Sequence, residues 1–248
     1  MHALARLQRR CGVAVALFGA GCSVVAASRG RGADTSFFPL APLSHWEYVV
    51  TRQGGHDTFH FVATVQPDDF RAQDGRRCRV VDERYGDVGP AERFPVVYCR
   101  EGGYLHRVMS LEYRGNALAD TGLRSGELKF LPTDLGPAQT WEGHTSAYRQ
   151  PDGSGFDVQQ LHQVMPDREQ VVVPAGAFSR CIRVETTAIH SATDASGAQV
   201  GPRVVYYYSD WYAPGVGLVR TEQRNADAEV LATIELVSYA IGHEPASP

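Results

Sequence analysis

Hydrophobic and polar residues alternate with a period of two along most of the chain after residue 44. Trp46, Tyr48 and Val50, for example, fall on one face of an extended segment. This pattern is typical of β-strands with one buried face, and no segment of ten or more residues keeps a 3.6-residue period. The sequence therefore predicts an all-β protein with few short helices. The expected strands are residues 44–52, 58–65, 76–84, 93–100, 104–113, 140–149, 155–164, 170–173, 180–190, 203–209, 216–222 and 229–240.

The two halves of the chain repeat weakly, with matching residues in the same order. Leu40 and Trp46 have the same spacing as Leu135 and Trp141. Because the offset between matches grows along the chain, they fit a duplicated unit with small loop insertions. We expect a curved antiparallel sheet of two duplicated halves, about 37–115 and 127–241, within a single β domain at 37–241, before a tail at 242–248. The further matches pair Arg77–Asp82 with Arg180–Glu185, Pro95–Tyr98 with Pro202–Tyr206, and Gly103–Leu105 with Gly217–Val219.

The first residues have the layout of a secretory signal. Met1–Arg10 is basic and has no acidic residue, Gly12–Phe18 is apolar, and small residues follow. The apolar run is too short to span a bilayer, which needs about 20 residues. We expect a signal peptide at 1–21 and a tether at 22–36, so the protein is predicted to be exported to the periplasm or outer membrane.

Two processing routes stay open for this signal. The segment Gly19–Cys22 resembles a bacterial lipobox, in which Cys22 becomes the lipidated first residue and anchors the protein to the membrane. Gly19 departs from the usual leucine of that motif. The alternative is ordinary cleavage after Ala27, with Val25 and Ala27 as the small recognition residues. We favour lipidation.

Composition fits a globular domain and argues against nucleic acid as a partner. The 248 residues are 43% hydrophobic, which is enough for a full core. The net charge is −4, and it becomes more negative once the basic signal is removed. A mildly acidic exported chain lacks the positive surface that binds nucleic acid.

Three cysteines remain in the domain after the signal is removed. If the strands at 76–84 and 93–100 form a hairpin, a register that pairs Val80 with Val97 also pairs Cys78 with Cys99. Directly opposed strand residues have Cβ atoms about 4.5–5.5 Å apart, close to the spacing of a disulfide. We predict a Cys78–Cys99 disulfide, with Cys181 as a small buried hydrophobic residue.

Patterns that would indicate catalysis or metal binding are weak. On a strand, His56 and His60 sit about 13 Å apart, too far for one zinc ion. The turn at Asp152–Gly155 lacks the distal acid of an EF-hand loop, and no serine stands in a Gly-x-Ser-x-Gly elbow. We predict that the polar residues serve turns and surfaces, and that the protein is not an enzyme and needs no cofactor or metal.

Three motifs resemble those of a group of bacterial secreted proteins and lipoproteins, some of which are labelled TapB-like. The group is distantly similar to the LolA/LolB-type curved half-barrels of the Gram-negative envelope. This resemblance implies a half-barrel whose concave face shelters acyl chains, although the covering helices of that fold are not evident. The motifs are Phe38–Leu40 with Trp46–Tyr48, Val173–Phe178 with Cys181, and Tyr212–Val219.

The sequence thus predicts a non-catalytic envelope protein that binds a hydrophobic or lipid-like ligand on the concave face. The aromatic run at 206–212 serves either packing or ligand contact. Two alternatives are an envelope assembly module with a protein partner and a glycan-binding module that uses Trp211 and Tyr212. The residues expected to line the ligand are Trp46, Tyr48, Trp141, Trp211, Tyr212 and Leu218.

Overall fold

The computed structural model describes residues 36–53, 57–72, 74–86, 92–110, 112–114, 117–120, 128–147 and 154–242. Within these ranges the secondary structure is all β, as predicted, and no helix could span a membrane. Cys22, His56 and Asp152 lie outside them. The strands are β1 (His45–Arg52), β2 (Thr58–Val65), β3 (Phe70–Arg71), β4 (Arg77–Tyr85), β5 (Glu92–Glu101), β6 (Tyr104–Ser110), β7 (Glu112–Arg114), β8 (Ala117–Asp120), β9 (Leu128–Pro132), β10 (Thr140–Ala147), β11 (Gly155–Val173), β12 (Gly176–Thr193), β13 (Val204–Ala213), β14 (Gly217–Arg224) and β15 (Val230–Ala240).

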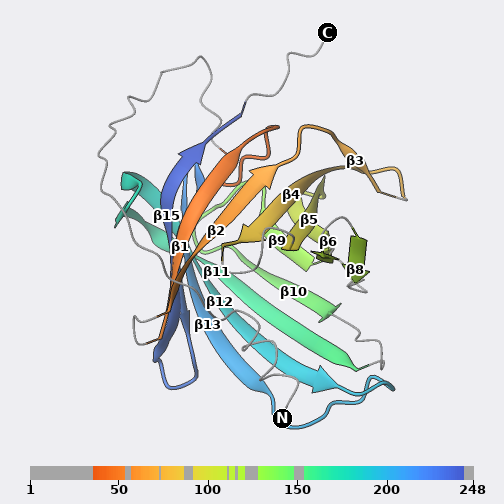
Figure 1. Cartoon of the computed structure of the whole chain (residues 1–248). Helices are drawn as coiled ribbons and strands as arrows, with labels where there is room; N and C mark the ends of the chain where they lie inside the picture. The colour runs from red at the N-terminus through yellow and green to blue at the C-terminus, as the bar shows by residue number, and fades with distance from the viewer. Residues whose placement is uncertain are drawn as a thin grey trace.

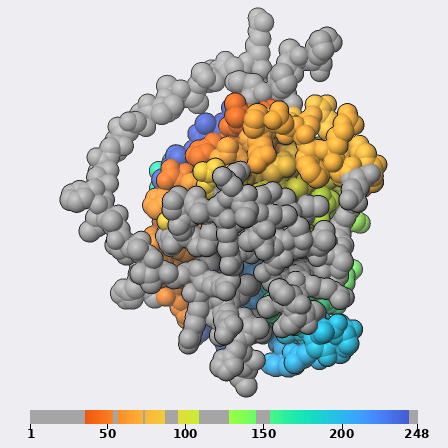
Figure 2. Space-filling view, turned by 45° about the vertical axis from the view of Figure 1, so that its right-hand side comes forward, coloured from red at the N-terminus to blue at the C-terminus, as the bar shows by residue number. Residues whose placement is uncertain are grey.

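The main sheet is antiparallel and curls into a nearly closed half-barrel (Figure 1). Its strand order is β10-β11-β12-β13-β14-β15-β1-β2-β4-β5-β6-β9, and β3, β7 and β8 pair off this path. The two end strands, β9 and β10, lie next to each other. The Trp141 indole N–H of β10 donates a hydrogen bond to the Lys129 carbonyl of β9 at 3.2 Å. The predicted curved antiparallel half-barrel is confirmed. The turn between β12 and β13 projects at the opposite end of the molecule from β3 (Figures 1 and 2).

The described strands of the main path form two consecutive six-stranded meanders that meet at the β15–β1 pair. Each pair of matching segments lies in or next to strands that hold the same position in their two meanders. Trp46 and Trp141 lie in the first strand of their meanders, β1 and β10. The cysteine matches lie in the third strands, β4 and β12, and the later matches in the fourth and fifth strands.

The turn before each first strand is also the same. Leu43 and Ala138, 95 positions apart like the two tryptophans, have φ values of 63° and 60°. The Leu43 N–H donates to the Val65 carbonyl at 3.0 Å, and the Ala138 N–H donates to the Val164 carbonyl at 3.1 Å. These shared turns support our proposal that a six-stranded unit was duplicated to form the single domain.

The strand prediction missed β3, β8 and β9, and it was wrong about the course of β11. The sequence predicted separate strands at 155–164 and 170–173, whereas the structure has one continuous strand from Gly155 to Val173. Register shifts lie between Val164 and Arg168 and between Glu169 and Val171. Such irregularities let a strand absorb residues that break the alternation, including a proline such as Pro166.

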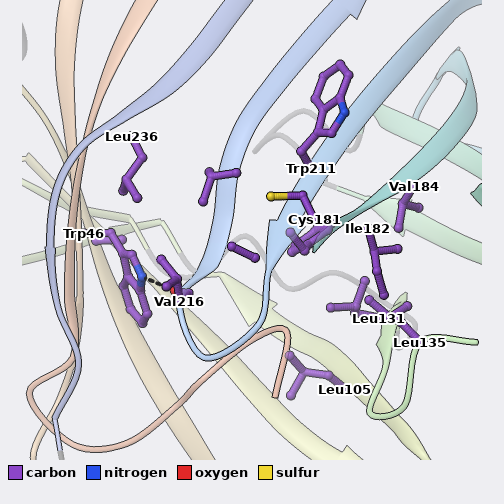
Figure 3. Packing of buried hydrophobic residues seen from close by; sticks show 14 of the residues in the cluster. Trp46, Leu105, Leu131, Leu135, Cys181, Ile182, Val184, Trp211, Val216 and Leu236 are labelled. Carbon is purple, nitrogen blue, oxygen red and sulfur yellow. Dashed lines mark hydrogen bonds between the residues drawn. The ribbon is translucent and has the colours of Figure 1, made fainter. Parts of the chain in front are cut away.

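Apolar side chains fill much of the half-barrel. Figure 3 shows Trp46 of β1 packed beside Val216, with its indole N–H donating to the Val216 carbonyl at 2.6 Å. Leu105 and Leu131 join the same buried cluster from β6 and β9. Part of the interior is therefore a packed core, and this core borders the cavity described below, since Leu131 belongs to both.

A smaller buried cluster surrounds Cys78 and Cys99. The β4–β5 hairpin has the register that the sequence predicted, with Val80 opposite Val97 and Cys78 opposite Cys99. The two cysteines form a disulfide, and Cys181 is a buried free cysteine.

Candidate functional site

A cavity of about 140 Å³ lies on the concave side of the sheet. Its walls come from β6, β9, β10, β11, β12 and β13, so it spans the place where the two ends of the sheet approach each other. In Figure 1, β10 to β13 run side by side in the lower half of the molecule. The cavity is lined by Arg107, Leu128, Phe130, Leu131, Trp141, Gln160, His162, Val184, Thr186, Tyr208, Asp210 and Tyr212.

Strand alternation places these side chains on the concave face. Successive residues of a strand point to opposite faces, so Tyr208, Asp210 and Tyr212 of β13 share one side. Gln160 and His162 do the same in β11. Seven of the twelve lining residues are apolar or aromatic, and the other five are polar or charged.

His162 is the best-defined polar group of the cavity. Its side chain is buried, with 7% of the residue exposed, and its Nδ1 lies 2.8 Å from the Thr186 hydroxyl oxygen. Burial lowers the pKa of His162 to about 4, so the imidazole is neutral at pH 7. The other ring nitrogen, Nε2, is buried and has no hydrogen-bond partner among the described residues.

Asp210 also lines the cavity, from β13, and the pKa of its carboxyl is raised. Burial raises its pKa to about 6, against the lowering effect of the hydrogen bond that Thr221 donates at 2.6 Å, and the charge of Glu185 raises it further. Burial also raises the pKa of Tyr208 and Tyr212, so both phenols stay protonated at neutral pH. The two phenols can donate as well as accept hydrogen bonds, whereas an ionised Asp210 carboxylate only accepts them.

Arg107 brings a cation into the same space from β6. Burial alone would lower the pKa of its guanidinium, but nearby Tyr98, Glu83 and Tyr85 raise it above its usual value. The side chain therefore stays charged, and its charge is balanced by acidic and phenolic groups of the first meander.

The structure corrects one prediction from the sequence. We expected the polar residues to serve turns and surfaces, yet Arg107, His162 and Asp210 converge from three strands on one sheltered cavity. Within the described ranges, no group of three or more His, Cys, Asp or Glu residues is placed to hold a metal ion. The arrangement offers hydrogen bonds and an aromatic wall, which suit binding of a small molecule.

The predicted lining residues fall in three places. Trp141 and Tyr212 line the cavity. Trp46 and Tyr48 belong to the packed core, where the Tyr48 hydroxyl donates to the Leu218 carbonyl at 3.1 Å, and Leu218 packs against that core. None of these three is part of the cavity wall.

Trp211 lies away from the cavity, on the other face of β13. Its residue is only 8% exposed, and its indole N–H donates to a Glu169 carboxylate oxygen at 2.8 Å. The Arg220 guanidinium lies over its ring, 5.2 Å from the centroid. The ring is thus engaged within the protein and offers little surface to an external ligand.

The sequence analysis missed Arg107, Gln160, His162 and Asp210. One signal could have found two of them. Gln160 and His162 lie on the same alternating face of β11 as Val164, whose residue is 1% exposed. Polar residues that interrupt an apolar strand face are uncommon in a core and indicate a buried polar site.

Comparison with known proteins supports the fold. A family model described as DUF3108-like matches residues 147–236, which cover β11 to β14 and part of β15. No curated protein matches. Two crystal structures are similar. One, a candidate exported protein with a YmcC-like fold from Bacteroides fragilis, has a TM-score of 0.54 and 15% sequence identity, and the match covers 83% of this chain and 99% of that one.

The other is a candidate lipoprotein from Parabacteroides distasonis, with a TM-score of 0.50 and 14% identity over 83% of this chain and 99% of that one. At such low identity these likenesses show a shared architecture. The chain is therefore similar to bacterial proteins described as exported or as lipoproteins, which agrees with the broad resemblance seen in the sequence. The narrower likeness to TapB-like and LolA/LolB-type proteins stays a prediction.

Proposed function

We propose that this protein is a non-catalytic component of the bacterial cell envelope that binds a small amphipathic ligand inside its half-barrel. The observation that carries the proposal is the cavity itself. It has an apolar and aromatic wall, and it holds buried polar atoms, Gln160 Oε1 and His162 Nε2, with no partner among the described residues. Buried polar atoms normally have hydrogen-bond partners, so these two favour a bound group.

The volume of the cavity limits the size of the ligand that it can hold. Pockets for drug-sized ligands usually measure about 300–1,000 Å³. The cavity here is about 140 Å³, and an engineered cavity of about 150 Å³ in another protein binds benzene. We infer a molecule the size of one ring, or the end of a lipid-like molecule, in place of the sheltered acyl chains that the sequence resemblance implies.

Three observations support export. The N-terminal sequence has the layout of a secretory signal. The Cys78–Cys99 disulfide is typical of proteins that fold in an oxidising compartment. The two similar structures are described as an exported protein and a lipoprotein. Lipidation of Cys22, with anchoring to a membrane, remains part of the proposal.

A second candidate function is an envelope assembly module. Leu161 and Tyr207 are 53% and 40% exposed and flank Thr187 in one row across β11, β12 and β13. Exposed apolar residues in one row across a sheet favour contact with another protein. The glycan-binding alternative has less support because the Trp211 ring is covered.

The proposal is tested by asking what the cavity holds. We would express the chain with its complete N-terminus in a Gram-negative bacterium, purify it from the envelope fraction and record native mass spectra. We expect a small molecule bound at one copy per chain, and we expect Val184→Phe, which fills the cavity, to lose it. Glu142→Ala, on an exposed position of β10, is the control and should keep it. Wild-type protein without any bound molecule, and unable to take up small aromatic probes, would contradict the proposal.

A further inference from the structure

The tip of the β11–β12 hairpin is apolar on both of its faces. The ten residues from Gln170 to Ser179 include no charged side chain, although 21% of the whole chain is charged. On the inner face, Val171 and Val173 are buried in the packed core. On the outer face, Val172 is 68% exposed, because successive strand residues point to opposite faces. The tip therefore closes the core on one side and presents apolar surface on the other.

Neighbouring residues extend this exposed surface. Ala177 lies directly opposite Val172 in the ladder, and both Ala177 and Pro174 of the turn are exposed. Tyr239 of β15 is 40% exposed, and its ring centroid lies 5.9 Å from that of Phe178 in the hairpin. In Figure 1 the hairpin tip is the teal turn beside β15. We call Val172, Pro174, Ala177 and Tyr239 the apolar tip.

The described chain begins at the same end of the sheet. The Ser36 carbonyl accepts a hydrogen bond from the Gly215 N–H at 2.9 Å, in the turn between β13 and β14. In the antiparallel order β11-β12-β13-β14, this turn and the β11–β12 turn lie at one end. Cys22, the expected lipidation site, precedes Ser36 by 14 positions, which is about 50 Å at full extension. An anchor at Cys22 would therefore keep the end with the apolar tip within reach of the membrane.

Arginine side chains flank the apolar tip. Arg168 and Arg180 are exposed, one on each strand of the hairpin. Asp167 is also exposed and offsets part of their charge, whereas Glu169 accepts a hydrogen bond from the Trp211 indole at 2.8 Å. Long arginine side chains can reach lipid phosphates while neighbouring apolar residues contact the membrane. These flanking charges are thus compatible with a phospholipid surface.

The size of the apolar tip favours a lipid surface over a protein partner. A specific protein interface typically involves about 20–30 residues on each side, many more than the apolar tip contains. Contact with a membrane needs no matching surface, because its strength follows the apolar area that enters the headgroup region. Tyrosine, present here as Tyr239, is also favoured at the boundary between membrane and water.

We propose that the apolar tip is a membrane-contact site that places Val172 in the headgroup region of a phospholipid bilayer. The contact orients the half-barrel with the β11–β12 hairpin toward the membrane. This inference goes beyond ligand binding in the cavity, and it rests on the export and anchoring parts of the proposed function.

The first test reports where the apolar tip lies. Val172→Cys protein is purified from the envelope fraction, labelled with an environment-sensitive fluorophore and reconstituted with vesicles of phosphatidylethanolamine and phosphatidylglycerol. The label should go to the new cysteine, because Cys181 is buried and Cys78 and Cys99 form a disulfide. We expect the vesicles to shift the emission to shorter wavelength and to remove most of the quenching by iodide.

Val200→Cys is the matched control. Val200 is 52% exposed and lies in the connection between β12 and β13, at the other end of β12 from the apolar tip. Its label should remain in water and keep its quenching by iodide. An unprotected label at Val172, or equal protection of the two labels, would overturn the proposal. Protection at Val172 that requires an added envelope protein would overturn it in favour of a protein partner.

The second test measures affinity in a Cys22→Ser chain, which cannot be lipidated. Val172→Asp should weaken partitioning into the same vesicles about tenfold, the change expected when one valine is no longer buried. Val200→Asp should leave partitioning unchanged, and equal effects of the two substitutions would contradict the proposal. Native mass spectra of the Val172→Asp protein should still show the cavity ligand, so failure of the membrane contact and failure of ligand binding are distinguished.

Discussion

The indole of Trp141 lies parallel to the imidazole of His162, with the ring centroids 4.7 Å apart and the planes at 12°. The two residues face each other in the β10–β11 ladder. Trp141 also donates its N–H to β9, whereas His162 contacts Thr186 of β12. This pair therefore links the place where the end strands β9 and β10 meet, the seam of the half-barrel, to the wall of the cavity.

His162 should remain neutral well below the usual pH range of histidine. Burial lowers its pKa from 6.5 to about 4 in the folded protein. The unfolded chain therefore binds a proton more readily than the folded protein. The free energy of unfolding should fall as the pH drops from about 7 to about 4, by at most about 1.4 kcal/mol for each unit of the pKa difference. NMR titration of the ring nitrogens checks the midpoint. A midpoint above pH 6 would contradict the buried, uncharged state.

Asp210 should affect stability in the opposite direction. Its pKa is raised from 3.8 to about 6, so the folded protein binds a proton more readily than the unfolded chain, and this residue favours folding as the pH falls from about 7 to about 4. Asp210→Asn removes the buried charge. We expect the variant to be more stable than wild type by roughly 1–3 kcal/mol at pH 8 and about equal at pH 4. Urea unfolding at both pH values measures this.

Thr221→Val provides the control for Asp210. It deletes the hydrogen bond that lowers the carboxyl pKa, so the apparent pKa of Asp210 should rise further. If Asp210→Asn were less stable than wild type at pH 8, the carboxylate would be making a favourable interaction that burial does not outweigh.

Loss of the Cys78–Cys99 disulfide should destabilise the folded protein. The bond closes a loop across 21 sequence positions. A loop of this length is worth roughly 3 kcal/mol in the chain-entropy model. Chemical unfolding with and without a reductant, repeated on a Cys78→Ala/Cys99→Ala variant, measures the effect. Reductant should change wild type and leave the double variant unchanged, because Cys181 is a free cysteine.

The Trp141 hydrogen bond should stabilise the seam between β9 and β10. No ladder joins these two strands in the part of the chain that the structure describes, so the bond to Lys129 is a main link across the seam. Trp141→Phe keeps an aromatic ring and deletes the donor. We expect faster amide hydrogen exchange in Leu128–Pro132, with a loss of about 1 kcal/mol in unfolding free energy.

Trp46→Phe is the comparison for this variant. It removes a similar hydrogen bond, to the Val216 carbonyl, inside the packed core. It should lower global stability without selectively exposing β9. Equal exchange rates in β9 for both variants would show that the seam does not depend on Trp141.

Much of the fold followed from local pattern, and the reason is physical. Two-residue alternation tells which face of a strand is buried, so most strands could be predicted. The register of the β4–β5 hairpin followed from pairing Val80 with Val97, because neighbouring strands joined by one turn have few alternative registers. The bulged course of β11 was not predictable, since the shifts near Arg168 depend on how the sheet curves.

The cavity was beyond the reach of sequence reasoning for a related reason. Alternation assigns Arg107, Gln160 and Asp210 to strand faces, and it carries no information about sheet curvature or about which faces come together. The sequence alone determined the all-β class, the positions of most strands, and the cysteine pair. Only the tertiary structure decided that β9 and β10 meet and that polar side chains from distant strands share one space, because those contacts depend on closure of the whole sheet.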